Sequence, residues 1–174
     1  MPLTVYYHPL DKKDSYIRIR DEGEQITMTI KYNINSLYPV EREVEINNFK
    51  EGHAILTFLG CKVKYSLEKI RETYILEGAK EIVFDSYPGL PTYMEIDCHT
   101  KEDLIRITHL LGFKMSDHDK RNASNMYKEI YGINQKEEDK KGFTFKNAHK
   151  IFGPLIKKNK KKFFNILKEQ NKLI

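Results

Sequence analysis

Like-charged residues stand two apart at several places in the sequence, a spacing that puts both side chains on one face of a β-strand. Three of these pairs are Arg18 with Arg20, Glu43 with Glu45, and Glu95 with Asp97. Like charges on one strand face repel each other unless a group of opposite sign lies between them. A solvated sheet face is the usual place for an isolated pair. A closed sheet that holds an anion beside a metal ion would bring both signs together.

Strands must carry these charges, because polar and apolar residues alternate around them. In the segment 15–20, Ile17 and Ile19 share one face and the two arginines share the other. We predict strands over residues 3–7, 15–20, 26–32, 40–46, 62–67, 69–76, 81–85 and 92–98, with one long strand over 62–76 as an alternative.

Apolar residues at helical spacing predict helices over residues 48–60, 100–112 and 123–131. Thr100 is a candidate cap, with Asp103 three residues later. Two C-terminal helices are predicted near 146–151 and 154–172, the second with Pro154 at its first position, and 135–141 is a charged loop. Together these elements predict an α+β fold, a meander of antiparallel strands with helices packed outside.

Length and composition narrow the class of protein. A chain of 174 residues can bury a stable core without disulfide bonds or bound metal ions, and its two cysteines are too few for a disulfide framework. No apolar run reaches the length of a membrane span, so a cytoplasmic location is the default. Seven lysines and one glutamate give the segment from Lys157 onward a charge of +6, which leaves −1 for the rest of a chain whose net charge is +5.

The ordered set of motifs resembles the CYTH family, which comprises class IV adenylyl cyclases, thiamine triphosphatases and related triphosphate tunnel enzymes. The motifs are Tyr16-Ile-Arg-Ile-Arg20, Thr27-Met-Thr-Ile-Lys31, Arg42-Glu-Val-Glu45, Glu68-Lys-Ile-Arg-Glu-Thr-Tyr74, and the run from Asp85 to Asp97. The resemblance extends from about residue 6 to 133. It implies an antiparallel β-barrel, the triphosphate tunnel, in a domain over 1–133, followed by a basic helical extension over 134–174.

The resemblance also implies roles for the charged residues. A triphosphate needs several cations from different strands, and arginine adds bidentate contacts to phosphate oxygens. The phosphate-binding residues would be Arg18, Arg20, Lys31, Lys69 and Arg71. Asp85, Glu95 and Asp97 would hold Mg²⁺ or Mn²⁺, which prefer carboxylate oxygens. Glu43, Glu45 and Lys31 would be catalytic, orienting the cations or positioning water.

Two departures from the family pattern leave the activity open. The family begins with a Glu-x-Glu-x-Lys strand, and none precedes Tyr16, so we expect a barrel that lacks its first strand, in a fragment or a short form. Pro91 stands where the family prefers glycine. The leading hypothesis is a metal-dependent hydrolase of a triphosphate-containing substrate. The alternatives are a cyclase that makes cyclic AMP from ATP, and a non-catalytic protein that binds triphosphates, nucleotides or RNA ends.

The segment from Lys157 to the C-terminus predicts a basic amphipathic helix, with Phe163, Phe164 and Leu167 among the lysines. We expect its apolar side to dock on the barrel. Binding to nucleic acid is the second option and an anionic membrane surface the third. A homodimer is a further option.

Overall fold

The structure, a computed structural model, describes residues 1–10, 13–34, 40–119, 121–134 and 142–174. Two compact units make up the chain: Met1–Glu68 with Gln135–Asn147, and Lys69–Asn134 with Ala148–Ile174. Neither unit ends at residue 133, so the division into a domain over 1–133 and an extension over 134–174 stays a prediction. The predicted loop over 135–141 lies outside the described residues.

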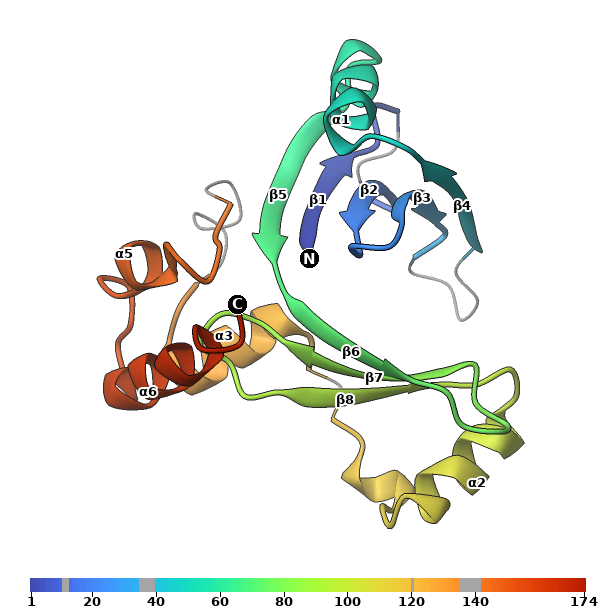
Figure 1. The fold of residues 1–174 in the computed structure, drawn as a ribbon, viewed down its shortest axis with the longest axis vertical. Coiled ribbons are helices and arrows are strands. Elements are labelled where there is room, and N and C mark those ends of the chain that lie inside the picture. Colours follow the sequence, from blue (N-terminus) through green and yellow to red (C-terminus); the bar gives the residue numbers. More distant parts are fainter. Residues whose placement is uncertain (11–12, 35–39, 120, 135–141) are drawn as a thin grey trace. The chain divides into compact units, whose positions relative to one another are not determined.

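The first unit is a five-stranded antiparallel sheet with one helix (Figure 1). The strands are β1 (Pro2–Tyr7), β2 (Ser15–Asp21), β3 (Ile26–Tyr32), β4 (Val40–Ile46) and β5 (Lys62–Glu68), and the helix is α1 (Phe49–Phe58). Their order in the sheet is β4-β3-β2-β1-β5. These elements confirm the predicted strands and the predicted helix, because the period of two in the sequence is the period of a pleated strand.

One face of this sheet is apolar and lies against α1. Tyr6, Ile19, Leu56 and Cys61 are buried there, and Met28 is among the partly buried residues packed against them. The helix approaches closely because Gly52 has no side chain: a Cβ at this position would lie 2.6 Å from the Cδ1 of Ile46. The opposite face of the sheet is therefore the one that carries the charged residues.

The second unit is a three-stranded antiparallel sheet with most of the helices. Its strands are β6 (Ile70–Tyr74), β7 (Glu81–Ser86) and β8 (Tyr93–Asp97), in the order β6-β7-β8. Its helices are α2 (Lys101–Leu110), the 3₁₀ turn η1 (Met115–Asp117), α3 (Ala123–Tyr131), α5 (Ala148–Phe152) and α6 (Lys160–Gln170). The predicted cap is confirmed, since the Thr100 hydroxyl accepts a hydrogen bond from Asp103 N at 3.0 Å.

The last helix begins later than the sequence predicted. Pro154 was expected at its first position, but α6 begins at Lys160, and Pro154 lies in a turn that follows α5. The reason is local: Asn159 adopts the left-handed conformation, with φ of 56°, which a continuous right-handed helix does not contain.

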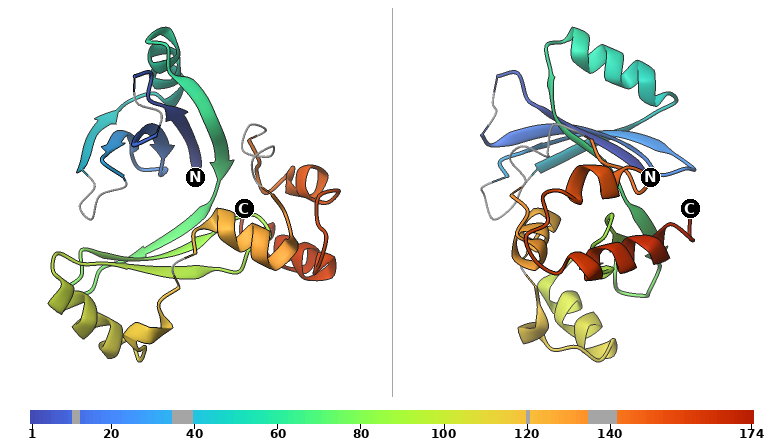
Figure 2. Two further views of the ribbon diagram at one scale, coloured as in Figure 1. Left: turned by 180° about the vertical axis from the view of Figure 1, so that it is seen from behind. Right: turned by 90° about the vertical axis from the view of Figure 1, so that its left-hand side faces the viewer.

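Helices α3 and α6 pack side by side around the turn between β7 and β8 (Figure 2). The Gln170 amide accepts a hydrogen bond from Gly89 N at 2.7 Å and donates to the carbonyl oxygens of Tyr87 and Leu90. From α3, the Tyr127 hydroxyl donates to Pro88 O at 2.8 Å. Phe163 and Leu167 of α6 are buried. The apolar side of the C-terminal helix therefore docks as expected, but on α3 and the β7–β8 turn of the second unit and not on a closed barrel.

The α+β class and the antiparallel pairing are confirmed, whereas the described residues form no closed barrel. Their strands make two separate sheets instead. The chain leaves the first sheet after Glu68 and enters the second at Ile70, so the alternative of one long strand over 62–76 is wrong. Within the described ranges, β4 and β8 are edge strands, each paired with one neighbour.

Candidate functional site

Three strands of the first unit place charged and hydroxyl side chains in rows across the polar face of the sheet. Strand register puts Arg18 beside Thr29, and Thr29 beside Glu43. We call these three residues the Arg18 row. The Arg20 row is the neighbouring set of Arg20, Thr27 and Glu45, which pair in the same strand order. Residues that face each other across a sheet in this way have Cβ atoms about 5 Å apart, so each row can form a connected chain of contacts.

The Arg18 row is internally satisfied. Arg18 Nε donates a hydrogen bond to the Thr29 hydroxyl at 3.2 Å, and that hydroxyl donates to Glu43 Oε2 at 2.6 Å. The Arg18 guanidinium is also 3.7 Å from Glu43. Thr29 is fully buried, so the hydroxyl bridge is shielded from water.

The Arg20 row has the same residue types but remains open. Arg20 Nε and the Thr27 hydroxyl are buried, and neither has a hydrogen-bond partner among the described residues. The other end of the guanidinium is engaged, because an NH₂ group of Arg20 lies 3.0 Å from Glu22. Leaving a buried donor unsatisfied costs about 1–3 kcal/mol. The two donors belong to directly paired residues of β2 and β3.

A third row joins Lys31 to Glu41, which form an ion pair. Burial alone would raise the pKa of Glu41, but the hydrogen bond from Lys31 and the charges of Lys31 and Arg18 hold this pKa below its usual value. Glu41 was not among the predicted site residues. The sequence held one signal for it, since it stands two residues before Glu43 and therefore on the same strand face.

In the second unit, two predicted phosphate ligands bind one carboxylate. Lys69 Nζ lies 2.7 Å from Asp85 Oδ2, and Arg71 makes two parallel bonds to Asp85 at 2.7 and 2.6 Å. Asp85 and Lys69 are buried, at 1% and 4% exposed. Burial by itself raises the pKa of Asp85, but the hydrogen bonds from Arg71 and Lys69 outweigh it and hold the pKa below the usual range. For Lys69, burial dominates, so its pKa is lowered despite Asp85.

The three predicted metal ligands do not converge. Asp85 faces Tyr93 across the sheet, whereas Asp97 is four residues further along β8, about 14 Å at the usual rise per residue. Asp85 is already bound to two cations, Glu95 lies 3.6 Å from Arg71, and Asp97 is paired with Lys80. Among the residues that the structure describes, no group of three His, Cys, Asp or Glu side chains is arranged to hold a metal ion. These carboxylates therefore do not fit one shared metal site.

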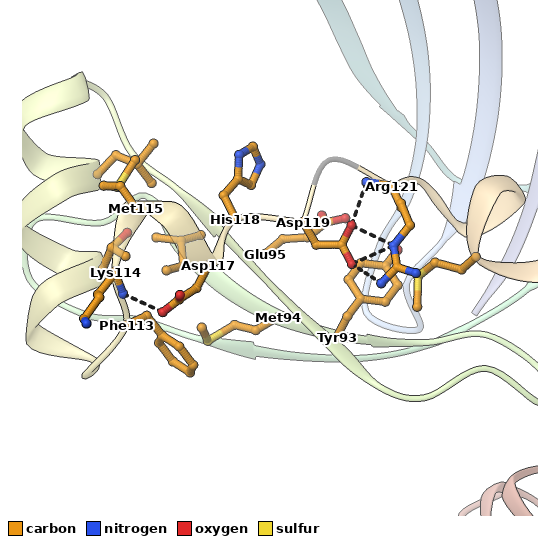
Figure 3. A pocket seen from close by; sticks show the side chains of 14 residues that line it. Tyr93, Met94, Glu95, Phe113, Lys114, Met115, Asp117, His118, Asp119 and Arg121 are labelled. Carbon is orange, nitrogen blue, oxygen red and sulfur yellow. Dashed lines mark hydrogen bonds and ion pairs between the residues drawn. The ribbon is translucent and has the colours of Figure 1, made fainter. Parts of the chain in front are cut away.

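A pocket of about 600 Å³ follows β8 in the second unit (Figure 3). Consecutive residues from Tyr93 to Ile96 line it, so both faces of this edge strand contribute to the wall. Asp119 and Arg121 on its other side are ion-paired with each other. Glu95 is the predicted metal ligand that reaches this pocket. Its lining combines apolar residues, among them Met94, Met115 and Phe113, with charged ones such as Lys114 and Asp117.

A family model for the CYTH domain matches residues 5–105, more than half of the sequence. The chain belongs to the CYTH family. CYTH proteins are triphosphate tunnel proteins and are generally dependent on a divalent metal. For this CYTH protein, the separation of Asp85 from Asp97 means that any metal site would need a different set of ligands.

Solved structures support the fold of the CYTH domain. A conserved hypothetical protein from Pyrococcus furiosus is 21% identical and superposes with a TM-score of 0.59, over 72% of this chain and 81% of that one. The PH1012 protein of Pyrococcus horikoshii is 17% identical with a TM-score of 0.59, over 72% and 80% of the two chains. The PH1819 protein of the same organism is 27% identical with a TM-score of 0.53, over 65% and 75%. No curated protein matches the sequence significantly.

None of the described helices is both long and apolar enough to pass through a membrane.

Proposed function

We propose that this protein binds a triphosphate-containing compound on the polar face of its five-stranded sheet, with Arg20 and Thr27 as its central donors. The observation that carries the proposal is the pair of buried, unsatisfied donors in the Arg20 row. The neighbouring Arg18 row has the same composition and is closed by its own hydrogen bonds. The Arg20 row is therefore the one of the two in which a phosphate oxygen would accept the missing hydrogen bonds.

Three cations lie on the polar face, beside the carboxylates Glu41, Glu43 and Glu45. Arg18, Arg20 and Lys31 lie on one face, and Glu41 and Glu43 hold them in position by ion pairs of 2.5–3.9 Å. These pairs are partly exposed, with 40% and 41% of the two glutamate side chains open to solvent, so each is weak enough for a phosphate group to replace. Lys69 and Arg71 stay predicted phosphate ligands, although each would have to share Asp85 to serve as one.

Calorimetric titration with tripolyphosphate, ATP and thiamine triphosphate tests this proposal. We expect Arg20→Gln to weaken binding by about 10-fold to 100-fold, the loss of one hydrogen bond between charged groups. Arg42→Gln is the matched control, since Arg42 is exposed and pairs with Ile30 on the opposite face of the sheet. Equal affinities of the two variants would show that the Arg20 row is not the phosphate site.

Hydrolysis of the bound triphosphate is the second candidate, favoured by the CYTH match. Glu43, Glu45 and Lys31 stay the proposed catalytic residues, with Mg²⁺ or Mn²⁺ as the proposed cofactor. Of these, Glu43 contacts the arginines through Thr29 and the ion pairs, and Glu45 belongs to the open row. A cyclase would use the same binding groups with the 3′-hydroxyl of ATP as the attacking group. A homodimer and a cytoplasmic location also remain proposals.

One assay separates these activities from binding alone. The protein is incubated with each triphosphate and either metal, and released phosphate and cyclic AMP are measured. Phosphate release that disappears in Glu43→Gln supports the hydrolase, and cyclic AMP supports the cyclase. Triphosphate binding without either product identifies a binding protein.

A further inference from the structure

The C-terminal helix α6 leaves its basic side unpartnered. Phe163, Leu167 and Gln170 face the interior of the second unit and are buried. The exposed side carries Lys161 and Lys168, which are seven residues apart and therefore lie on one side of the helix, and Lys172 follows in the turn after α6. More lysines lie at the start of the helix: Lys157, Lys158, Lys160 and Lys162, all exposed. The one acidic residue in this segment, Glu169, is already paired with Lys172 at 2.6 Å.

The lysines at the start of α6 belong to a segment that is hydrogen-bonded to α3. The backbone N–H of Lys157 donates to Tyr131 O at 2.9 Å, and the side-chain amide of Asn159 donates to Ile130 O at 2.8 Å. Both bonds tie the beginning of α6 to α3. The cluster is therefore part of the folded second unit.

The start of α6 breaks the local rules of helix stability. Lys160, Lys161 and Lys162 occupy the first turn, where the helix dipole disfavours positive charge, and no acidic residue accompanies them. Asn159 is left-handed and its side chain makes no capping hydrogen bond. A place that departs from several stability rules at once is expected to be a functional site or a strained one.

A basic amphipathic helix can bind a membrane surface or a nucleic acid, and the burial of its apolar side decides which of the two suits α6. Membrane binding by an amphipathic helix requires a free apolar face, and here Phe163 and Leu167 are inside the fold. One aromatic ring does remain at the surface among the lysines: Phe164, which is 36% exposed and held edge-on against Phe163. Basic residues around an exposed ring are the arrangement that binds single-stranded nucleic acid, through phosphates and base stacking.

We infer that the outer surface of α6 binds single-stranded nucleic acid. The lysines contact the phosphates, and the ring of Phe164 stacks on a base. The inference does not rest on the proposed triphosphate site, which lies on other residues. The segment from Lys157 onward carries a charge of +6, whereas the remainder of the chain carries −1, so the excess positive charge of the protein lies in this segment.

The test is fluorescence anisotropy of the full-length protein with labelled oligonucleotides of about 20 nucleotides, RNA and DNA, single-stranded and duplex, between about 50 and 200 mM salt. We expect the variant K160Q/K161Q/K162Q to bind at least 10-fold more weakly. The slope of the logarithm of the binding constant against the logarithm of the salt concentration should become shallower by about 2. The control K50Q/K101Q/K128Q removes the same charge from exposed positions elsewhere and should bind normally. Phe164→Leu should weaken binding to single strands while leaving binding to tripolyphosphate unchanged.

Thermal unfolding completes the test, because the first triple variant removes positive charge from a helix N-terminus and should melt at the same or a higher temperature. Several results would overturn the inference: equal losses in both triple variants, duplex bound as tightly as single strands, no binding, or binding only to vesicles that contain phosphatidylserine. The last result would assign the lysines to a membrane surface.

Discussion

Replacing Thr27 and Thr29 by valine, one at a time, tests whether the two rows of the polar face differ as described. Both threonines are buried, lie on β3, and stand between an arginine and a glutamate. Valine keeps the branched shape that suits a strand and removes only the hydroxyl. The two variants therefore compare one chemical change in a closed row and in an open row.

The Thr29 hydroxyl accepts from Arg18 and donates to Glu43, so Thr29→Val removes both bonds and leaves only the longer ion pairs of Arg18 and Glu43. Because Arg18 and Glu43 are partly exposed, we expect a loss of about 2–3 kcal/mol in the free energy of unfolding. For a chain of this size, that loss corresponds to a melting temperature about 5–10 °C lower. Tripolyphosphate affinity should change less than about threefold, because the open row is intact.

The Thr27 hydroxyl has no partner among the described residues, so Thr27→Val removes an unsatisfied buried group. We expect unchanged stability or a gain of about 1 kcal/mol, a melting temperature up to about 4 °C higher. The same variant should bind tripolyphosphate about 10-fold to 100-fold more weakly, since it lacks one hydrogen bond to a charged phosphate.

Differential scanning calorimetry and isothermal titration measure both quantities on the same samples. The reasoning is refuted if Thr27→Val melts well below the unaltered protein and binds tripolyphosphate normally. In that case Thr27 would have a partner within the fold, and the open row would not be a phosphate site.

Three further outcomes follow from contacts in the second unit. Asp85→Asn leaves the buried Lys69 and the partly buried Arg71 without their shared carboxylate, and urea unfolding should show a loss of about 3–5 kcal/mol. The pKa of Asp85 is lowered in the folded protein, so its contribution is present above the unfolded pKa of 3.8 and is lost as the pH falls through the folded value. Unfolding curves between about pH 7 and 3 should show this loss, and Asp85→Asn should lack it. Gln170→Ala removes three hydrogen bonds to the turn before β8 and should cost about 1–3 kcal/mol, whereas Asn165→Ala on the exposed side of α6 should cost almost nothing.

Secondary structure was largely predictable from this sequence, because it depends on local periodicity. Alternation in residues 15–20 and 26–32 located β2 and β3, and helical spacing located α3 at residues 123–131. The late start of α6 was not predictable, since no local signal shows that Asn159 adopts a left-handed conformation. The absence of a closed barrel among the described strands also could not be predicted, because it depends on which strand edges pair.

The residue types of the candidate site were predictable from the sequence, but the contacts that these residues make across neighbouring strands were not. Alternation established by itself that Arg18 and Arg20 share a face, because a strand turns its side chains to opposite sides in turn. Only the register across β2, β3 and β4 decided that Thr29 closes one row with Glu43 while Thr27 leaves the other open. Likewise, Lys69 and Arg71 reach Asp85 across 16 and 14 residues of sequence. Strand periodicity is a local property of the chain, whereas register and burial arise from packing between distant segments, and they determine which buried donors lack a partner among the described residues.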